Sequence, residues 1–143
     1  MIEEELTEQQ LENLKEENDS LLKEFEEWLL ATGLKQTTVN THVSNVEFFV
    51  NDYLLAYDGV RPEDGIDEIS YFMGSWFIRK ALWASIGSLK SNAASFKKFY
   101  TFLYEKGLIG SEDLETLKQT IKLGMTDWLD ELEDCDSLSD DFF

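Results

Sequence analysis

Apolar residues recur every three or four positions along most of this chain, which is the spacing of one face of an α-helix. Thr7 and Gln10 have the spacing of a capping box, so we expect a short acidic helix over residues 8–17. The polar run "KEEND" then interrupts the pattern. A second helix is expected from an N-cap at Asp19 or Ser20 to a stop at Gly33, with these positions inside: Leu21, Leu22, Phe25, Trp28 and Leu29.

The next helix is predicted over residues 37–57, with Thr37 as its cap. Its apolar face is expected to carry Val39, Val43, Val46, Val50, Tyr53, Leu54 and Tyr57. Its polar face carries Asn40, Thr41, Ser44 and Asn45. Phe48 and Leu55 also fall on the polar side, so we expect the second half of this helix to be covered on both sides.

Residues 58–67 hold the only proline and two glycines, and this composition predicts a loop. A nearly uniform apolar run over residues 70–84 predicts a buried helix in which Gly74 is an unfavourable residue. Gly87 and Ser88 open another helix, which is expected to stop at Gly107. A last helix is predicted from Ser111 to about residue 134, with a core stripe of Leu114, Leu117, Ile121, Met125, Trp128 and Leu132.

These elements predict an all-α fold, a compact bundle of five to six helices, because no alternating strand pattern occurs. We expect an acidic N-terminal helix or arm over 1–18, a helical domain over 19–110, an amphipathic acidic helix over 111–134 packed on it, and an acidic, frayed tail over 135–143. The stripe of the last helix fits packing either on the core or on a second copy, so the oligomeric state stays open.

The 143 residues suit about one domain, and 43% of them are apolar, which suffices for a core. No apolar run is long enough to span a membrane, and the acidic start is unlike a secretory signal. We therefore expect a soluble, cytoplasmic protein without membrane partners. The single cysteine, Cys135, has no second cysteine to pair with and is expected to be a reduced thiol.

The net charge of -18 is concentrated at the two ends of the chain. Residues 1–33 and 105–143 each sum to -9, whereas residues 34–104 sum to zero. Ile69 to Tyr104 contains no Asp or Glu at all. A uniformly acidic coat would spread its acids along the chain, so the neutral middle indicates a surface from which acids are excluded.

Candidate catalytic and metal-binding chemistry is sparse. His42 is the only histidine, lies at the edge of an apolar face and is expected to be a packing residue. Tyr100 and Tyr104 fit core and rim aromatics. The acids of the last helix, Asp127, Asp130, Glu131, Glu133, Asp134 and Asp136, fit a solvated helix end better than a cation site. We expect no enzyme activity, no catalytic residue, no metal and no cofactor.

Three segments in order resemble the N-terminal core-binding, SAM-like domain of tyrosine recombinases and phage integrases. They are the helix with Phe25 and Trp28, then "GLKQTTVNTHVSNVEFFVNDYL", and later "SNAASFKKFYTFLYEKGLI". The likeness covers about Asp19 to Ile109. In that family the helical domain clamps duplex DNA, and a separate domain performs the chemistry. That second domain has no counterpart here, and the chain's two arginines and one histidine lie outside the family's catalytic motifs.

The resemblance implies a DNA-facing surface on two helices: Asn40, Thr41, Ser44 and Asn45 on the first, and Lys90, Lys97 and Lys98 on the second. Acids would repel phosphate there, which accounts for the acid-free window. Solubilising lysines on an exposed face are the alternative interpretation. Because the sequence pI is about 4.2, we expect any DNA binding to be weak and salt-sensitive.

Two functions follow as expectations. The first is a stand-alone, non-catalytic module with weak DNA binding or an accessory role in DNA recombination or mobile-element biology. The second is an acidic scaffold or DNA mimic for a basic protein partner, such as a recombinase, bound through Asp127, Asp130, Glu131, Glu133 and Asp134. The neutral middle favours the first, and the total charge favours the second.

Overall fold

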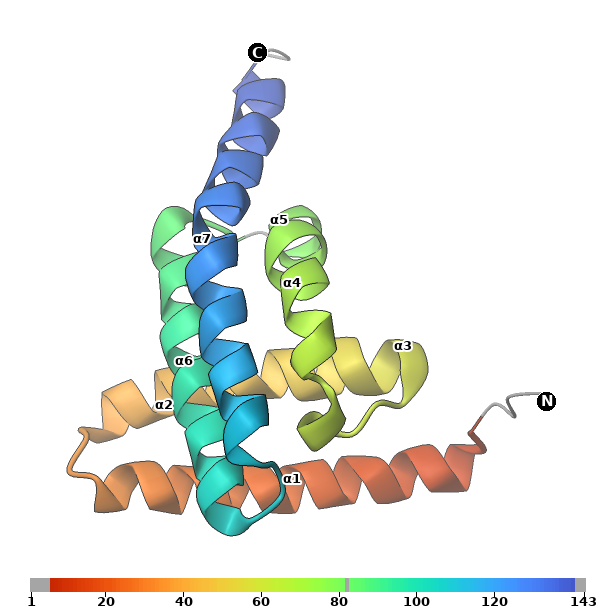
Figure 1. Cartoon of the computed structure of the whole chain (residues 1–143). Helices are drawn as coiled ribbons and strands as arrows, with labels where there is room; N and C mark the ends of the chain where they lie inside the picture. The colour runs from red at the N-terminus through yellow and green to blue at the C-terminus, as the bar shows by residue number, and fades with distance from the viewer. Residues whose placement is uncertain (1–5, 82, 141–143) are drawn as a thin grey trace. The chain divides into compact units, whose positions relative to one another are not determined.

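The computed structural model describes residues 6–81 and 83–140, and within these residues every regular element is a helix (Figure 1). The predicted all-α class is confirmed. The chain divides into two compact units, Met1–Gly65 and Ile66–Phe143. The boundary between them falls at the end of the predicted glycine- and proline-bearing loop, inside the 19–110 segment. Among the described residues there is no helix both long and apolar enough to cross a membrane.

The first unit begins with α1 (Glu8–Ala31), a single helix of 24 residues. The predicted capping box is present, since the Thr7 hydroxyl accepts from the Gln10 N–H at 3.1 Å and the Gln10 side chain accepts from the Thr7 N–H at 2.8 Å. The predicted break near residue 19 is wrong. Asn18 is buried inside the polar run and donates from Nδ2 to Asn51 Oδ1 at 3.0 Å, so a polar residue here serves the core.

Local side-chain pairing also supports helix α1 through this segment. Lys15 Nζ lies 3.0 Å from Asp19 Oδ2, one turn further along the helix. The hydrogen bond to Asp19 raises the pKa of Lys15 above its ordinary value. Helix α1 ends at the predicted place, with Thr32 as C-cap and Gly33 at φ 93°, a left-handed conformation that favours glycine.

A second rod of the first unit packs on α1 and consists of α2 (Gln36–Glu47), the π-helical η1 (Phe48–Leu55) and α3 (Ala56–Asp58). It begins at Gln36 with Lys35 as N-cap, so the predicted cap at Thr37 is wrong by two residues. The wider π turns shift the side-chain phase, which buries Phe49 and leaves Tyr57 58% exposed, against expectation. The short 3₁₀ turn η2 (Pro62–Asp64) follows.

The second unit starts with η3 (Ile66–Glu68) and one continuous helical stretch made of α4 (Ile69–Tyr71), the π-helical η4 (Phe72–Trp76) and α5 (Phe77–Lys80). This stretch is buried on one side through Ile69, Phe72, Met73, Phe77 and Ile78. The predicted helix over 70–84 therefore exists but ends earlier. Ala81 has φ -87° and ψ 121°, an extended backbone that terminates the helix.

Helices α6 (Ile86–Lys106) and α7 (Ser111–Asp140) form the rest of the second unit. Helix α6 starts from a capping box between Ser85 and Ser88, and it stops at Gly107, which adopts φ 87° as predicted. Its inner face buries Leu89, Phe96, Phe99, Tyr100 and Leu103. A turn over residues 107–110 returns the chain, so α6 and α7 are antiparallel neighbours (Figure 1).

Helix α7 packs on α4, η4, α5 and α6 of its own unit. Leu114, Leu117, Ile121, Trp128 and Leu132 of the predicted stripe are buried, whereas Met125 is only half-buried. The helix continues to Asp140, so the expected frayed tail is wrong for residues 135–140, and residues 141–143 lie outside the described part of the chain. The continuing helical backbone agrees with the absence of Gly and Pro between Met125 and Asp140.

Candidate functional site

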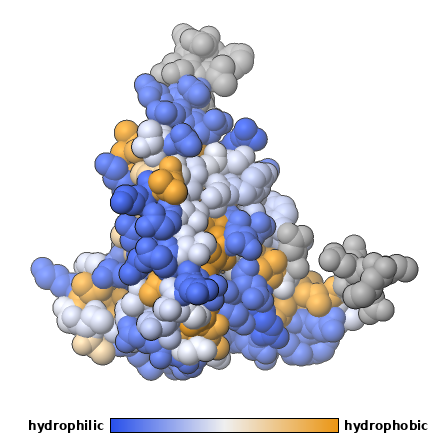
Figure 2. Space-filling view, in the orientation of Figure 1, coloured by the Kyte–Doolittle hydropathy of each residue, from blue (hydrophilic) through white to orange (hydrophobic). Residues whose placement is uncertain are grey.

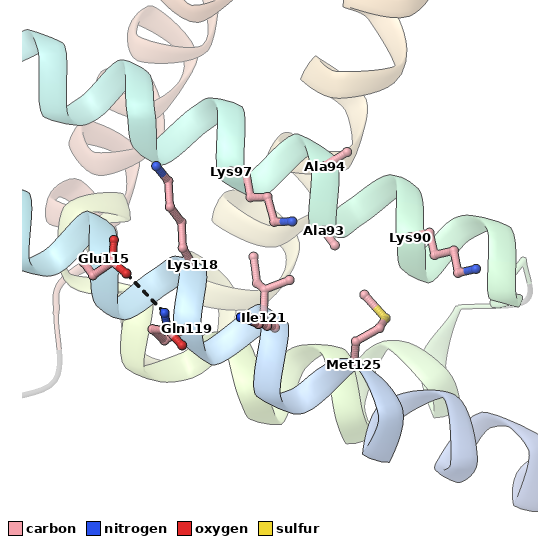
Figure 3. A pocket seen from close by; sticks show the side chains of 10 residues that line it. Lys90, Ala93, Ala94, Lys97, Glu115, Lys118, Gln119, Ile121 and Met125 are labelled. Atoms are coloured by element: carbon pink, nitrogen blue, oxygen red, sulfur yellow. Dashed lines mark hydrogen bonds between the residues drawn. The ribbon is translucent and has the colours of Figure 1, made fainter.

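A groove of about 650 Å³ runs between α6 and α7 within the second unit (Figure 3). Helix α6 contributes Lys90, Ala93, Ala94 and Lys97. Helix α7 contributes Glu115, Lys118, Gln119, Ile121, Lys122 and Met125. We call this site the lysine groove. Figure 3 shows Lys118 extending from α7 toward α6, and Ile121 and Met125 lying between the two helices.

Helical spacing explains why these side chains share one groove. Lys90, Ala94 and Lys97 are separated by four and three residues, so they follow one another along one side of α6. Lys118 and Lys122 are four apart and do the same on α7. The start of α7 is set by Asp113, whose Oδ2 accepts from the Gly110 N–H at 3.1 Å. Small alanines on α6 leave room for the floor of the groove.

The groove is positively charged within an acidic protein. It holds four of the twelve basic residues of the chain and only one acid, Glu115. Glu115 Oε1 accepts a hydrogen bond from Gln119 Nε2 at 3.1 Å. Within the described part of the chain, no ion pair occupies the ammonium group of Lys90, Lys97, Lys118 or Lys122. Their charge is therefore available to an anionic ligand.

The two units differ strongly in charge. The first holds 16 acids and 4 bases, a net of -12, and the second holds 14 acids and 8 bases, a net of -6. Within the second unit, residues 66–122 hold 6 acids and 8 bases, a net of +2. Residues 123–143 then hold 8 acids and no base. The lysine groove thus lies in the one large part of the chain with an excess of bases.

The residues of the predicted DNA face lie on both units. Lys90 and Lys97 line the groove, whereas Lys98 is half-buried and lies outside it. On α2 of the first unit, Asn40, Thr41 and Ser44 are exposed and Asn45 is half-buried. Asn40 accepts from Gln36 Nε2 at 2.8 Å, and the Thr41 hydroxyl donates to the Thr37 carbonyl at 3.2 Å. Both of these bonds are local to the helix.

Sequence reasoning missed Lys118 and Lys122. These two lysines lie in a segment whose summed charge is -9, and that average concealed them. Their spacing of four residues on an amphipathic helix was the available signal, because it places both on one side of α7. The antiparallel packing of α7 on α6 then brings them opposite Lys90 and Lys97.

The alternative, acidic candidate site occupies the second half of α7. Asp127, Asp130, Glu133 and Asp134 are exposed, whereas Glu131 is half-buried and lies 3.8 Å from Arg79 Nη2. Figure 2 shows hydrophilic side chains over most of this face of the protein, with apolar residues scattered among them. Among the described residues, no group of three or more His, Cys, Asp or Glu side chains is arranged to hold a metal ion.

The other residues singled out by the sequence belong to the packing. His42 is buried on α2, as expected of a packing residue. Tyr100 is fully buried and Tyr104 is 43% exposed, which confirms their predicted places in the core and at the rim. Comparisons of the chain with protein-family models, with curated proteins and with solved structures found no match. Any function must therefore be argued from these residues themselves.

Proposed function

We propose that this protein is a non-catalytic module that binds the DNA backbone weakly through the lysine groove, in an accessory role in DNA recombination or other mobile-element biology. The observation that carries the proposal is the meeting of four lysines from two helices around one groove. The resemblance to a recombinase core-binding domain supplies the choice of DNA. Two of these lysines, Lys90 and Lys97, belong to the face that the resemblance implies.

Phosphate chemistry suits this groove. Affinity for duplex DNA comes largely from lysines and arginines that neutralise phosphates and release counterions. Four lysines that all reach phosphates correspond to a slope of about -3.6 for log K against log salt. The side chains lining the groove include no arginine and no aromatic ring, and Gln119 is bonded to Glu115. We therefore expect binding that depends little on base sequence.

The α2 residues extend the proposal to the first unit. Asn40, Thr41 and Ser44 are exposed and uncharged, and such side chains hydrogen-bond to phosphate oxygens without attracting them over a distance. We expect their contribution to be smaller than that of the lysines. A single negative charge introduced on this face of α2 tests whether it contacts DNA, because the charge repels phosphate mainly near the substituted residue.

The proposal includes no catalysis, and the surroundings of the arginines and the histidine support this part of it. Arg61 pairs with Glu17, and Arg79 lies beside Glu131, so the two arginines of the chain both have acidic neighbours. His42 is buried in the packing of α2. A recombinase-type site needs several arginines and histidines around a nucleophilic tyrosine, and the chain has two arginines and one histidine.

A second candidate function is binding to a basic protein, such as a recombinase, through the acidic half of α7. The exposure of Asp127, Asp130, Glu133 and Asp134 favours it, together with the lack of any base after Lys122. In this case the acidic helix would occupy a partner surface that otherwise holds DNA. Neutralising these four acids would then abolish partner binding and leave the groove untouched.

The test is a titration of labelled duplex DNA with the full chain at a series of salt concentrations. At about 100 mM salt we expect Lys118→Glu/Lys122→Glu and Lys90→Glu/Lys97→Glu each to weaken binding at least about tenfold and to lower the salt slope by about 2. The matched control is Lys23→Glu/Lys80→Glu, which makes the same charge change at exposed sites outside the groove.

The outcomes separate the candidates. Equal losses in the groove variants and the control would mean that only total charge matters, and the groove assignment would fail. A loss confined to the groove variants supports the proposal, and a further loss in Ser44→Asp adds α2 to the DNA face. No binding by the unmodified chain at any salt concentration would overturn DNA binding and favour the acidic partner-binding function.

A further inference from the structure

An exposed leucine lies near the middle of α7, about one turn before a row of exposed aspartates. Leu123 is 73% exposed, the highest value among the large apolar residues whose side chains the structure describes. At about 100° per residue, Leu123, Asp127, Asp130 and Asp134 fall within an arc of about 60° on one side of the helix. We call these four residues the acidic stripe. A single exposed leucine is ordinary on a protein surface, so its part in a contact depends on the charges beside it.

The lysine groove complements this stripe in charge and in form. Its floor holds the apolar side chains of Ala94 and Met125, and lysines from both helices surround that floor. Asp127 and Asp134 are seven residues apart, as are Lys90 and Lys97, so both pairs span about 10.5 Å of helix. Leu123 precedes Asp127 by four residues, or about 6 Å, so a helix whose aspartates meet the lysines places Leu123 at one end of the groove.

One copy of the chain cannot make this contact with itself. The acidic stripe lies about 130° around α7 from Lys118 and Lys122 of the groove. Both features belong to the same continuous helix, Ser111–Asp140, so a helical α7 cannot bring its own stripe into its own groove. A contact between the acidic stripe and the lysine groove therefore requires two molecules.

We propose that the lysine groove of one copy receives the acidic stripe of a second copy, and that this self-association competes with DNA for the groove. The competition rests on the DNA-binding function proposed above, whereas the self-association stands on the two surfaces alone. The stripe supplies a row of negative charges in the place of phosphates. Because the two surfaces differ, the contact is head-to-tail and propagates to a ring or a chain unless its angle closes a dimer.

Charge swapping tests this proposal directly. In sedimentation velocity from about 10 µM to about 500 µM protein at about 100 mM salt, we expect the mass of the wild-type chain to rise above the 16.6 kDa monomer. The groove variant Lys97→Glu/Lys118→Glu/Lys122→Glu and the stripe variant Asp127→Lys/Asp130→Lys/Asp134→Lys should each stay monomeric. An equimolar mixture of the two should associate again, because opposite charges then meet.

Three results would overturn the proposal. A wild-type chain that stays at 16.6 kDa throughout removes the self-association. A mixture that stays monomeric while the wild type associates places the contact elsewhere, provided that far-UV circular dichroism shows both variants folded. Leu123→Ser keeps every charge, so undiminished association in that variant removes the apolar part of the contact and with it the fit to the groove.

The competition is measured in the same preparations. With the groove intact, Asp127→Asn/Asp130→Asn/Asp134→Asn should bind duplex DNA several-fold more tightly than Glu8→Gln/Glu12→Gln/Glu16→Gln, which removes three exposed acids from α1. Equal gains would mean a general charge effect and no competition. If the wild type binds DNA without self-associating, the inference fails and the proposed function stands. If the wild type self-associates without binding DNA, the self-association stands and the proposed DNA-binding function fails.

Discussion

At the scale of single residues, Trp128 explains two glycines in helical segments of the second unit. A Cβ atom on Gly74 would lie 2.6 Å from Trp128 Cδ1, and one on Gly124 would overlap the indole ring. Side chains of a helix lean toward its N-terminus, so Trp128 covers the preceding turn at Gly124. The apparent cost of Gly74 in a helix is therefore offset by the close approach of a large buried ring.

This packing predicts the sign of a glycine substitution. Gly74→Ala should destabilise the protein by up to about 2 kcal/mol, because overpacking against Trp128 costs about 1–3 kcal/mol and the gain in helix propensity offsets about 1 kcal/mol of it. Gly87→Ala is the control, since a Cβ there has only Ser85 Oγ within 4 Å, at 3.8 Å. That change should be neutral or stabilising in urea denaturation. Equal effects at the two positions would contradict the packing argument.

At the scale of elements, a hydrogen bond between side chains connects α1 to η1. Asn18 Nδ2 donates to Asn51 Oδ1 at 3.0 Å, and Asn51 Nδ2 donates to Asp19 Oδ1 at 3.3 Å. Both asparagines are buried, so each satisfies a group that would otherwise be desolvated without a partner. The polar run "KEEND", which predicted a break between two helices, is therefore part of one continuous helix.

Removing one side chain of the buried Asn18–Asn51 hydrogen bond should lower the stability of the protein. Asn51→Ala leaves Asn18 buried without its acceptor and should cost about 1–3 kcal/mol of unfolding free energy. Asn13→Ala removes only an exposed bond with Gln9 and should cost less than about 0.5 kcal/mol. Urea denaturation of the two variants provides the measurement. A loss of the same size in Asn13→Ala would show that the buried bond has no special role.

At the scale of the whole molecule, local and total charge act over different distances. The lysine groove is locally positive, while the chain carries a net charge of -18. The Debye length is about 30 Å at 10 mM salt and about 8 Å at 150 mM. At low salt an approaching polyanion therefore interacts with the whole acidic chain, and at moderate salt it interacts mainly with the nearby lysines.

This difference predicts a maximum in the salt dependence of DNA binding. As salt falls from about 500 mM to about 100 mM, affinity should rise, and below about 50 mM it should level off or decline because repulsion by the whole chain grows. A titration series over this range measures it. A linear increase down to about 10 mM would mean that the acidic parts of the chain do not reach the bound DNA.

The sequence by itself determined the helical class, most helix ends and the uneven distribution of charge. Caps such as Thr7 with Gln10, and stops such as Gly33 and Gly107, act through neighbouring backbone groups and can be read locally. Only the tertiary structure decided which distant residues meet. The burial of Asn18 depends on Asn51, and the groove depends on the packing of Lys118 and Lys122 opposite Lys90 and Lys97. Contacts between separate helices follow from packing, which no local pattern specifies.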